Sequence, residues 1–104
     1  MEVILPLHAS AVNGTMADVR ACLAEAYSSG MVRYFEADDE SGFLSAGSMT
    51  GRDDMAVSVY GNDERMMLVS RFDNLGKGAS GAAIQNMNIT LGVPEDTGLV
   101  TGGN

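Results

Sequence analysis

Apolar residues recur along the chain with two periods, and each period predicts a different kind of element. Strand-like runs cover residues 2–7, 31–35, 55–60 and 64–72. The last two runs are separated by Gly61-Asn62-Asp63, a sequence typical of a turn, so we expect them to form a β-hairpin. The first run is expected to end near Pro6 and His8.

Helical spacing predicts two helices. The first is expected to start at Thr15, because Thr15 with Asp18 three residues later resembles a capping box, and to end at Gly30. The second is expected to cover 77–91 and to stop at Gly92, a left-handed position that a proline soon follows. The apolar face of the first helix is expected to carry Val19, Cys22, Leu23, Ala26 and Tyr27.

These elements predict one α+β domain over residues 1–104, in which a mixed or antiparallel sheet is combined with two main helices. The stretch 36–51 is expected to be an irregular connection with a short strand at Phe43-Leu44. Residues 100–104 are expected to form a flexible tail, since nothing in the sequence suggests a partner for them.

The composition argues against several kinds of protein. Asp and Glu outnumber Lys and Arg by 14 to 6, and the net charge of −8 disfavours a nucleic-acid partner. One cysteine cannot form an internal disulfide framework and suits a reducing, cytoplasmic compartment. No apolar run is long enough to cross a membrane, and the first residues lack the basic region of a signal peptide. A single Cys and a single His are too few for a zinc site, so no metal is expected.

A glycine-rich segment lies between the last strand and the last helix. Gly76, Gly78 and Gly81 spell G-x-G-x-x-G with Lys77 inside it. A dinucleotide-binding βαβ unit would need an acidic residue about twenty positions later, and Thr101 stands there, so the pattern does not predict that fold. Two interpretations stay open: an anion site at the helix start beside Lys77, or a turn that lets the helix pack closely on its neighbours.

The segment 73–95, continued by 97–99, resembles the carboxy-terminal signature of N-acetyl-γ-glutamyl-phosphate reductase, of the semialdehyde dehydrogenase family. Weaker similarity occurs at 3–8 and 55–62, and the signature as a whole spans 72–99. One position departs from the family pattern: Gly51-Arg52-Asp53 stands where Gly-Ser/Thr-Asn is usual.

The resemblance implies the fold of part of a glyceraldehyde-3-phosphate dehydrogenase-like C-terminal dimerisation domain. It also implies a role in arginine biosynthesis, in which NADPH reduces an acyl phosphate to a semialdehyde through a thioenzyme intermediate. The family's nucleophilic cysteine and catalytic histidine belong to motifs absent here, so no catalytic residue is assigned. Cys22 is expected in the core and His8 in a structural or surface role. We therefore expect a C-terminal fragment, inactive alone, with weak or no NADP binding.

The resemblance assigns cofactor-binding residues to the glycine-rich segment. In related dehydrogenases an amide side chain after the aspartate of this turn contacts the nicotinamide carboxamide, and Asn74 occupies that position. Lys77 and Gly78 flank the helix start where the backbone would approach the cofactor. The alternative for Asn74 is a turn residue that caps the helix or bonds locally.

Two kinds of partner are expected. The small residues at the start of the last helix, with Ile84, Met87 and Leu91 at helical spacing, predict a packing surface. That surface would serve a homodimer or a missing N-terminal cofactor domain. The alternative function is a free-standing dimerising module that binds an anionic metabolite at residues 76–81.

Overall fold

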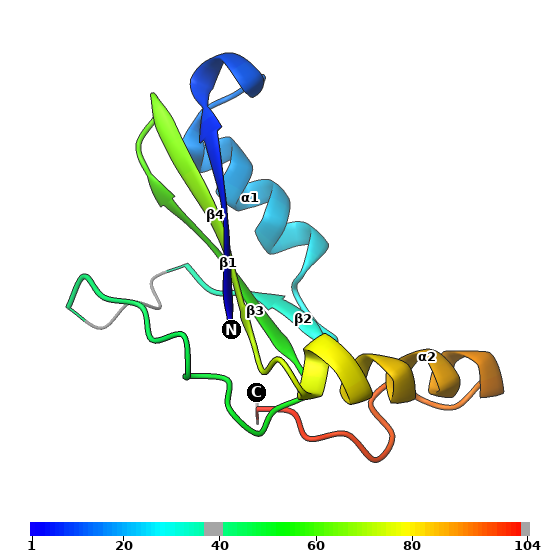
Figure 1. Cartoon of the computed structure of the whole chain (residues 1–104). Coiled ribbons are helices and arrows are strands. Elements are labelled where there is room, and N and C mark those ends of the chain that lie inside the picture. Colours follow the sequence, from blue (N-terminus) through cyan, green and yellow to red (C-terminus); the bar gives the residue numbers. More distant parts are fainter. Residues whose placement is uncertain (37–40, 103–104) are drawn as a thin grey trace.

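The structure, a computed structural model, describes residues 1–36 and 41–102 and confirms the predicted α+β class. Figure 1 shows α1 lying along one face of a twisted sheet and α2 projecting from one end of it. Two short helical turns, a 3₁₀ turn at Ala9–Ala11 and a π-helical turn at Gly76–Ser80, precede the two helices. The main elements are β1 (Glu2–His8), α1 (Met16–Ala26), β2 (Val32–Tyr34), β3 (Met55–Gly61), β4 (Arg65–Phe72) and α2 (Gly81–Leu91).

The sheet is mixed and has the strand order β1-β4-β3-β2. β3 and β4 form the predicted antiparallel hairpin, β1 pairs antiparallel with β4, and β2 runs parallel to β3. β1 does not stop at Pro6 but continues to His8. It is an edge strand, the position where a sheet tolerates proline.

Local signals place the start of α1 and the end of α2 as predicted, whereas α2 begins at Gly81 and not at residue 77, since the π-helical turn occupies Gly76–Ser80. The Thr15 hydroxyl accepts a hydrogen bond from the Asp18 N–H, and the Asp18 carboxylate accepts one from the Thr15 N–H, so the predicted capping box is confirmed. Gly92 ends α2 in the left-handed conformation, with φ of 73°. The first helix ends at Ala26, earlier than predicted, and Gly30 serves the following turn with φ of 93°.

The core is formed by the two inner strands, β3 and β4, together with two methionines from outside the strands. Its buried apolar side chains are Met31, Met49, Ala56, Val59, Met66 and Val69, and α1 has no buried residue. The prediction that Cys22 is a core residue is wrong, because Cys22 is exposed. The half-buried face of α1 is rotated toward Arg20, whose guanidinium donates to the Val59 carbonyl at 3.0 Å, and this rotation turns Cys22 outward.

One prediction about the irregular segments is wrong, and the described part of the tail has partners that the sequence did not suggest. Phe43 makes only an isolated bridge and is 78% exposed, so the short strand at Phe43-Leu44 does not form. The tail is held at residues 100–102: the Gly102 carbonyl accepts from Arg33 and the Gly102 N–H donates to Asp54. Residues 37–40 and 103–104 lie outside the described residues. Within the described ranges, no helix is long and apolar enough to span a membrane.

Candidate functional site

Asp73 follows β4, and its carboxylate accepts backbone hydrogen bonds at the start of the glycine-rich turn. One oxygen accepts from the Gly51 N–H at 2.6 Å, and the other accepts from the Leu75 N–H at 2.9 Å. These backbone donors lower the pKa of Asp73 below its usual range. The negative charge that a helix start favours is therefore already supplied from within the chain.

Backbone donors of the π-helical turn are also engaged. The Gly78 N–H donates to the Asp73 carbonyl at 3.0 Å, and the Ser80 N–H donates to the Leu75 carbonyl at 3.1 Å. An anion at this turn would have to compete with the chain's own acceptors for these groups. The geometry gives the anion-site interpretation of residues 76–81 no support.

Close packing explains two of the glycines. A Cβ atom on Gly76 would overlap the Arg52 carbonyl oxygen, and one on Gly81 would lie 2.5 Å from Asp53 Oδ1. The segment Gly51-Arg52-Asp53 is thus the neighbour on which the turn packs. This supports the second interpretation of the glycine pattern and gives a structural role to the segment that departs from the family pattern.

Asn74 is the predicted cofactor-binding residue whose side chain remains available. It is exposed, and its amide makes no hydrogen bond within the described part of the chain. The local bonding that was the alternative for Asn74 is performed by Asp73 instead. An exposed amide that can both donate and accept is suited to an amide ligand.

The Lys77 side chain is hydrogen-bonded within the chain, which argues against a role at the helix start. Its ammonium donates to the Gln85 side-chain oxygen at 2.5 Å, and the Gln85 amide donates to the Glu95 carboxylate at 3.0 Å. These side chains tie the π-helical turn, α2 and the segment after α2 together. Of the predicted residues Asn74, Lys77 and Gly78, only Asn74 presents a side-chain group that the chain itself does not use.

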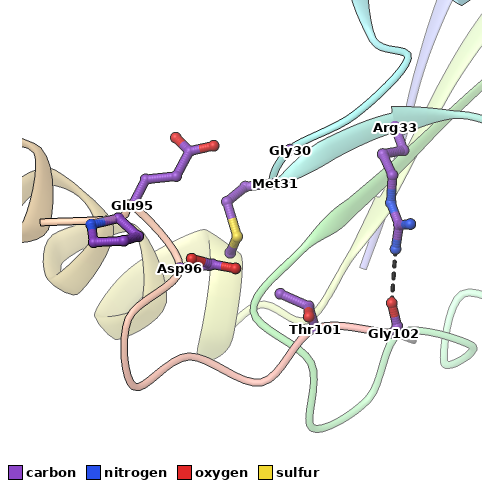
Figure 2. A pocket seen from close by; sticks show the side chains of 8 residues that line it. Gly30, Met31, Arg33, Glu95, Asp96, Thr101 and Gly102 are labelled. Carbon is purple, nitrogen blue, oxygen red and sulfur yellow. Dashed lines mark hydrogen bonds between the residues drawn. The ribbon is translucent and has the colours of Figure 1, made fainter. Parts of the chain in front are cut away.

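Sequence reasoning missed a cavity of about 360 Å³ beside β2, which Figure 2 shows from close by. Arg33 lies on one side and donates to the Gly102 carbonyl at 2.8 Å, while Glu95 and Asp96 lie on the other. The Arg33 Nε atom is buried without a partner. No local signal could have found this cavity, because its lining comes from distant segments: Gly30, Met31, Arg33, Pro94, Glu95, Asp96, Thr101 and Gly102.

Asp54 is hydrogen-bonded both to Gly102, which lines this cavity, and to Arg52, which lies beside the glycine-rich turn. Its side chain is 2% exposed and receives two hydrogen bonds from Arg52, at 2.8 and 2.6 Å. Burial raises the pKa of Asp54, but the hydrogen bonds from Arg52 and the Gly102 N–H outweigh burial, and the pKa is lowered overall. Asp54 is therefore a structural anion that fixes the C-terminal segment.

The structure offers no assembled nucleophile and base in residues 1–36 and 41–102. Cys22 lies on the exposed side of α1, and His8 ends β1 opposite Arg65. Neither side chain has a hydrogen-bond partner in this part of the chain. No group of His, Cys, Asp and Glu residues there could hold a metal ion.

Comparison with known proteins confirms the predicted similarity. The chain is 56% identical over 59 residues to N-acetyl-gamma-glutamyl-phosphate reductase 2 of Nostoc sp., which covers 55% of this chain and 18% of that protein. It is 54% identical over 59 residues to the N-acetyl-gamma-glutamyl-phosphate reductase of Trichormus variabilis, with the same coverage of both chains. With the reductase of that name from Brucella ovis it shares 40% identity over 99 residues, 88% of this chain and 32% of that protein. The chain thus spans a third or less of these relatives, and no protein-family model matches it.

Proposed function

We propose that this chain supplies the C-terminal part of an NADP-dependent N-acetyl-γ-glutamyl-phosphate reductase of the cytoplasm. The similarity to reductases over 88% of the chain supports this proposal. The observation that carries it is Asn74, which is exposed, makes no side-chain hydrogen bond within the described residues and stands where the resemblance implies a cofactor contact. We also propose that its fold is part of a glyceraldehyde-3-phosphate dehydrogenase-like C-terminal domain, and the mixed sheet with two helices supports this.

Asn74 would hold the nicotinamide end of the cofactor. The amide presents one donor group and one acceptor oxygen, which match the acceptor and donor of the nicotinamide carboxamide. When bound, NADPH supplies the hydride that converts the acyl phosphate to the semialdehyde with release of phosphate. Asn74 would contribute orientation by holding the nicotinamide carboxamide.

The remaining chemistry would come from the rest of a reductase. The described residues lack a paired nucleophile and base, and reduction of an acyl phosphate through a thioenzyme requires both. In arginine biosynthesis this chain would therefore act only together with a cofactor-binding domain and a nucleophilic cysteine. Lys77 and Gly78 would support the turn that presents Asn74 instead of touching the cofactor.

A chimeric enzyme tests the proposal. The matched span of the Brucella ovis reductase is replaced by this chain, and NADPH oxidation with N-acetyl-γ-glutamyl phosphate is measured. We expect activity, and we expect Asn74→Ala to raise the KM for NADPH about tenfold, the effect of losing roughly 1.4 kcal/mol of hydrogen bonding. Asn86→Ala, on the exposed side of α2, is the matched control. A folded, active chimera in which Asn74→Ala and Asn86→Ala behave alike would overturn the role of Asn74, and a folded but inactive chimera would overturn the function.

A further inference from the structure

Asn13 lies in the segment between the 3₁₀ turn and α1 and is followed by Gly14. Both residues are exposed, and neither belongs to a helix or a strand. An asparagine in such a segment can react with the backbone nitrogen of the next residue, because its side-chain carbonyl and that nitrogen can close a succinimide ring. This pair therefore has the sequence and the exposure that the reaction requires.

The reacting groups are free of hydrogen bonds. Neither the Gly14 N–H nor the Asn13 side chain makes a hydrogen bond within residues 1–36 and 41–102. Gly14 has no Cβ to obstruct ring closure, and glycine adopts unusual backbone angles more readily than any other residue. No hydrogen bond of the Gly14 nitrogen has to be broken before the ring closes.

The cap of α1 explains why a glycine stands at position 14. A Cβ there would lie 2.9 Å from Oδ2 and 3.2 Å from Cβ of Asp18, and Asp18 forms the capping box together with Thr15. A side chain at position 14 would therefore press on the carboxylate that accepts from the Thr15 N–H. The glycine that the cap favours is the same residue that leaves Asn13 open to attack.

We propose that Asn13 is a site of spontaneous deamidation and isoaspartate formation at the start of α1. The Gly14 nitrogen forms a bond to Cγ of Asn13 and the bond from Cγ to the amide nitrogen breaks, so that ammonia leaves with the proton that Gly14 loses. Water, the only co-reactant, then opens the ring. If the bond between the nitrogen and Cγ breaks, the product is aspartate. If the bond between the nitrogen and the main-chain carbonyl carbon breaks, the product is isoaspartate, in which the main chain runs through the side chain.

Both products change the start of α1, and neither depends on the proposed reductase function. Each adds one negative charge to a chain whose net charge is −8. Aspartate keeps the main chain as it is and only places its charge ahead of a helix N-terminus, where a negative charge is favourable. Isoaspartate lengthens the main chain by one methylene directly before Gly14, so Thr15 no longer meets Asp18 at the distances of the capping box. The isoaspartate form therefore loosens the start of α1.

The other described asparagines lack this combination. Asn62 is followed by an aspartate, and its Oδ1 accepts two backbone hydrogen bonds, at 2.9 and 3.0 Å. Asn88 is buried in α2, and its amide donates to two backbone carbonyls. Asn74 and Asn86 are exposed, but each is followed by a residue with a long side chain, which hinders closure of the ring. Among the described asparagines the reaction is therefore expected at Asn13.

Ageing of the purified chain tests the proposal. Trypsin cleaves after Lys and Arg, so Asn13 is the sole asparagine of the peptide 1–20 and Asn62 is the sole asparagine of the peptide 53–65. After incubation at mildly alkaline pH and physiological temperature, mass spectrometry and labelling by isoaspartyl methyltransferase measure both peptides. We expect isoaspartate to form about tenfold faster or more in 1–20, because Asn62 must first lose its hydrogen bonds. Asn13→Gln, which keeps the amide but closes a larger ring far more slowly, is the matched control and should stay unlabelled.

A synthetic peptide of residues 9–20 gives the rate without the fold, and amide exchange gives the effect on α1. Peptide 1–20 free of isoaspartate after the synthetic peptide has reacted would overturn the proposal, as would equal rates in the two tryptic peptides. By NMR we expect the Asp18 amide to exchange about fivefold faster in the isoaspartate form than in Asn13→Asp, which adds the charge alone. Equal exchange in these two chains would overturn the effect on the cap.

Discussion

Asp53 and Val100 bind each other through two hydrogen bonds, although 47 positions separate them in the chain. The Asp53 N–H donates to the Val100 carbonyl at 2.7 Å, and the Val100 N–H donates to the Asp53 carboxylate at 2.9 Å. The same carboxylate also lies against Gly81 at the start of α2. One side chain thus joins the C-terminal segment to the glycine-rich turn.

Removing this carboxylate should release the C-terminal segment. We expect Asp53→Ala to lower the free energy of unfolding by about 0.5–1.5 kcal/mol, the net value of one hydrogen bond, and to speed amide exchange at Val100. Urea unfolding and hydrogen exchange measure the two effects. Asp96→Ala is the control, because Asp96 is exposed and only its carbonyl is engaged. Unchanged exchange at Val100 would show that the segment is held without Asp53.

Two glycine substitutions should have different effects although alanine favours helices at both sites. A Cβ on Gly81 would lie 2.5 Å from Asp53 Oδ1 and against the Gly76 backbone, so Gly81→Ala should cost about 1–3 kcal/mol through overpacking. A Cβ on Gly78 would lie 3.2 Å from the Phe72 ring and 3.4 Å from the Asp73 carbonyl oxygen, which are milder contacts than those at Gly81. We expect Gly78→Ala to cost less than Gly81→Ala. Thermal unfolding compares them, and equal costs would contradict the packing explanation of the pattern.

The elements that the sequence predicted well depend on residues close together in the chain. The capping box needs only Thr15 and Asp18, and the hairpin needs alternation on both sides of Gly61-Asn62-Asp63. The glycine pattern identified the turn, but its neighbour, the Arg52 carbonyl, could not be read from the pattern. Asn74 was found by resemblance, and only the structure shows that its amide has no partner among residues 1–36 and 41–102.

Other features depend on long-range contacts and left no local signal. Arg33, Asp54 and Gly102 meet only because β2, the segment before β3 and the C-terminal segment converge. The orientation of α1 was mispredicted for a related reason. Apolar spacing places Cys22 on the inner face, but the half-buried face of α1 includes Arg20, whose guanidinium donates to the Val59 carbonyl, and Cys22 is exposed.

Asp54 should make stability depend on acid pH. Its pKa is lower in the folded chain than the usual value of about 3.9, so its contribution is fully present above about pH 4 and is lost as pH falls through the folded pKa. Asp54→Ala leaves Arg52 and the Gly102 N–H without this acceptor and should cost about 1–3 kcal/mol at neutral pH.

The measurement is urea unfolding of wild type and Asp54→Ala between about pH 7 and pH 2. The difference between the two chains should be largest at neutral pH and should shrink below about pH 4. Other carboxylates with lowered pKa, such as Asp73, affect both chains and cancel in the difference. A difference that stays constant across this range would mean that packing, and not the charge of Asp54, carries the effect.

Cys22 should react in the native state. Because the residue is exposed on α1, a thiol reagent should modify it at a rate close to that in the urea-unfolded chain. Cys22→Ser should change the free energy of unfolding by no more than about 0.5 kcal/mol, as expected for an exposed substitution. If Cys22 reacted only after unfolding, the prediction that Cys22 is a core residue would be right.

The isolated chain should bind NADP weakly or not at all and should not oxidise NADPH with N-acetyl-γ-glutamyl phosphate. Asn74 offers one amide, and the backbone donors of Gly78 and Ser80 already serve Asp73 and Leu75, so most of the contacts that a dinucleotide needs are missing. The absence of a Cys–His pair in the described residues removes the chemistry as well. Titration calorimetry and an absorbance assay of NADPH measure the two properties. Micromolar binding that Asn74→Ala leaves unchanged would reveal a cofactor site elsewhere, whereas NADPH oxidation abolished by Cys22→Ala would show that the chain is itself a reductase.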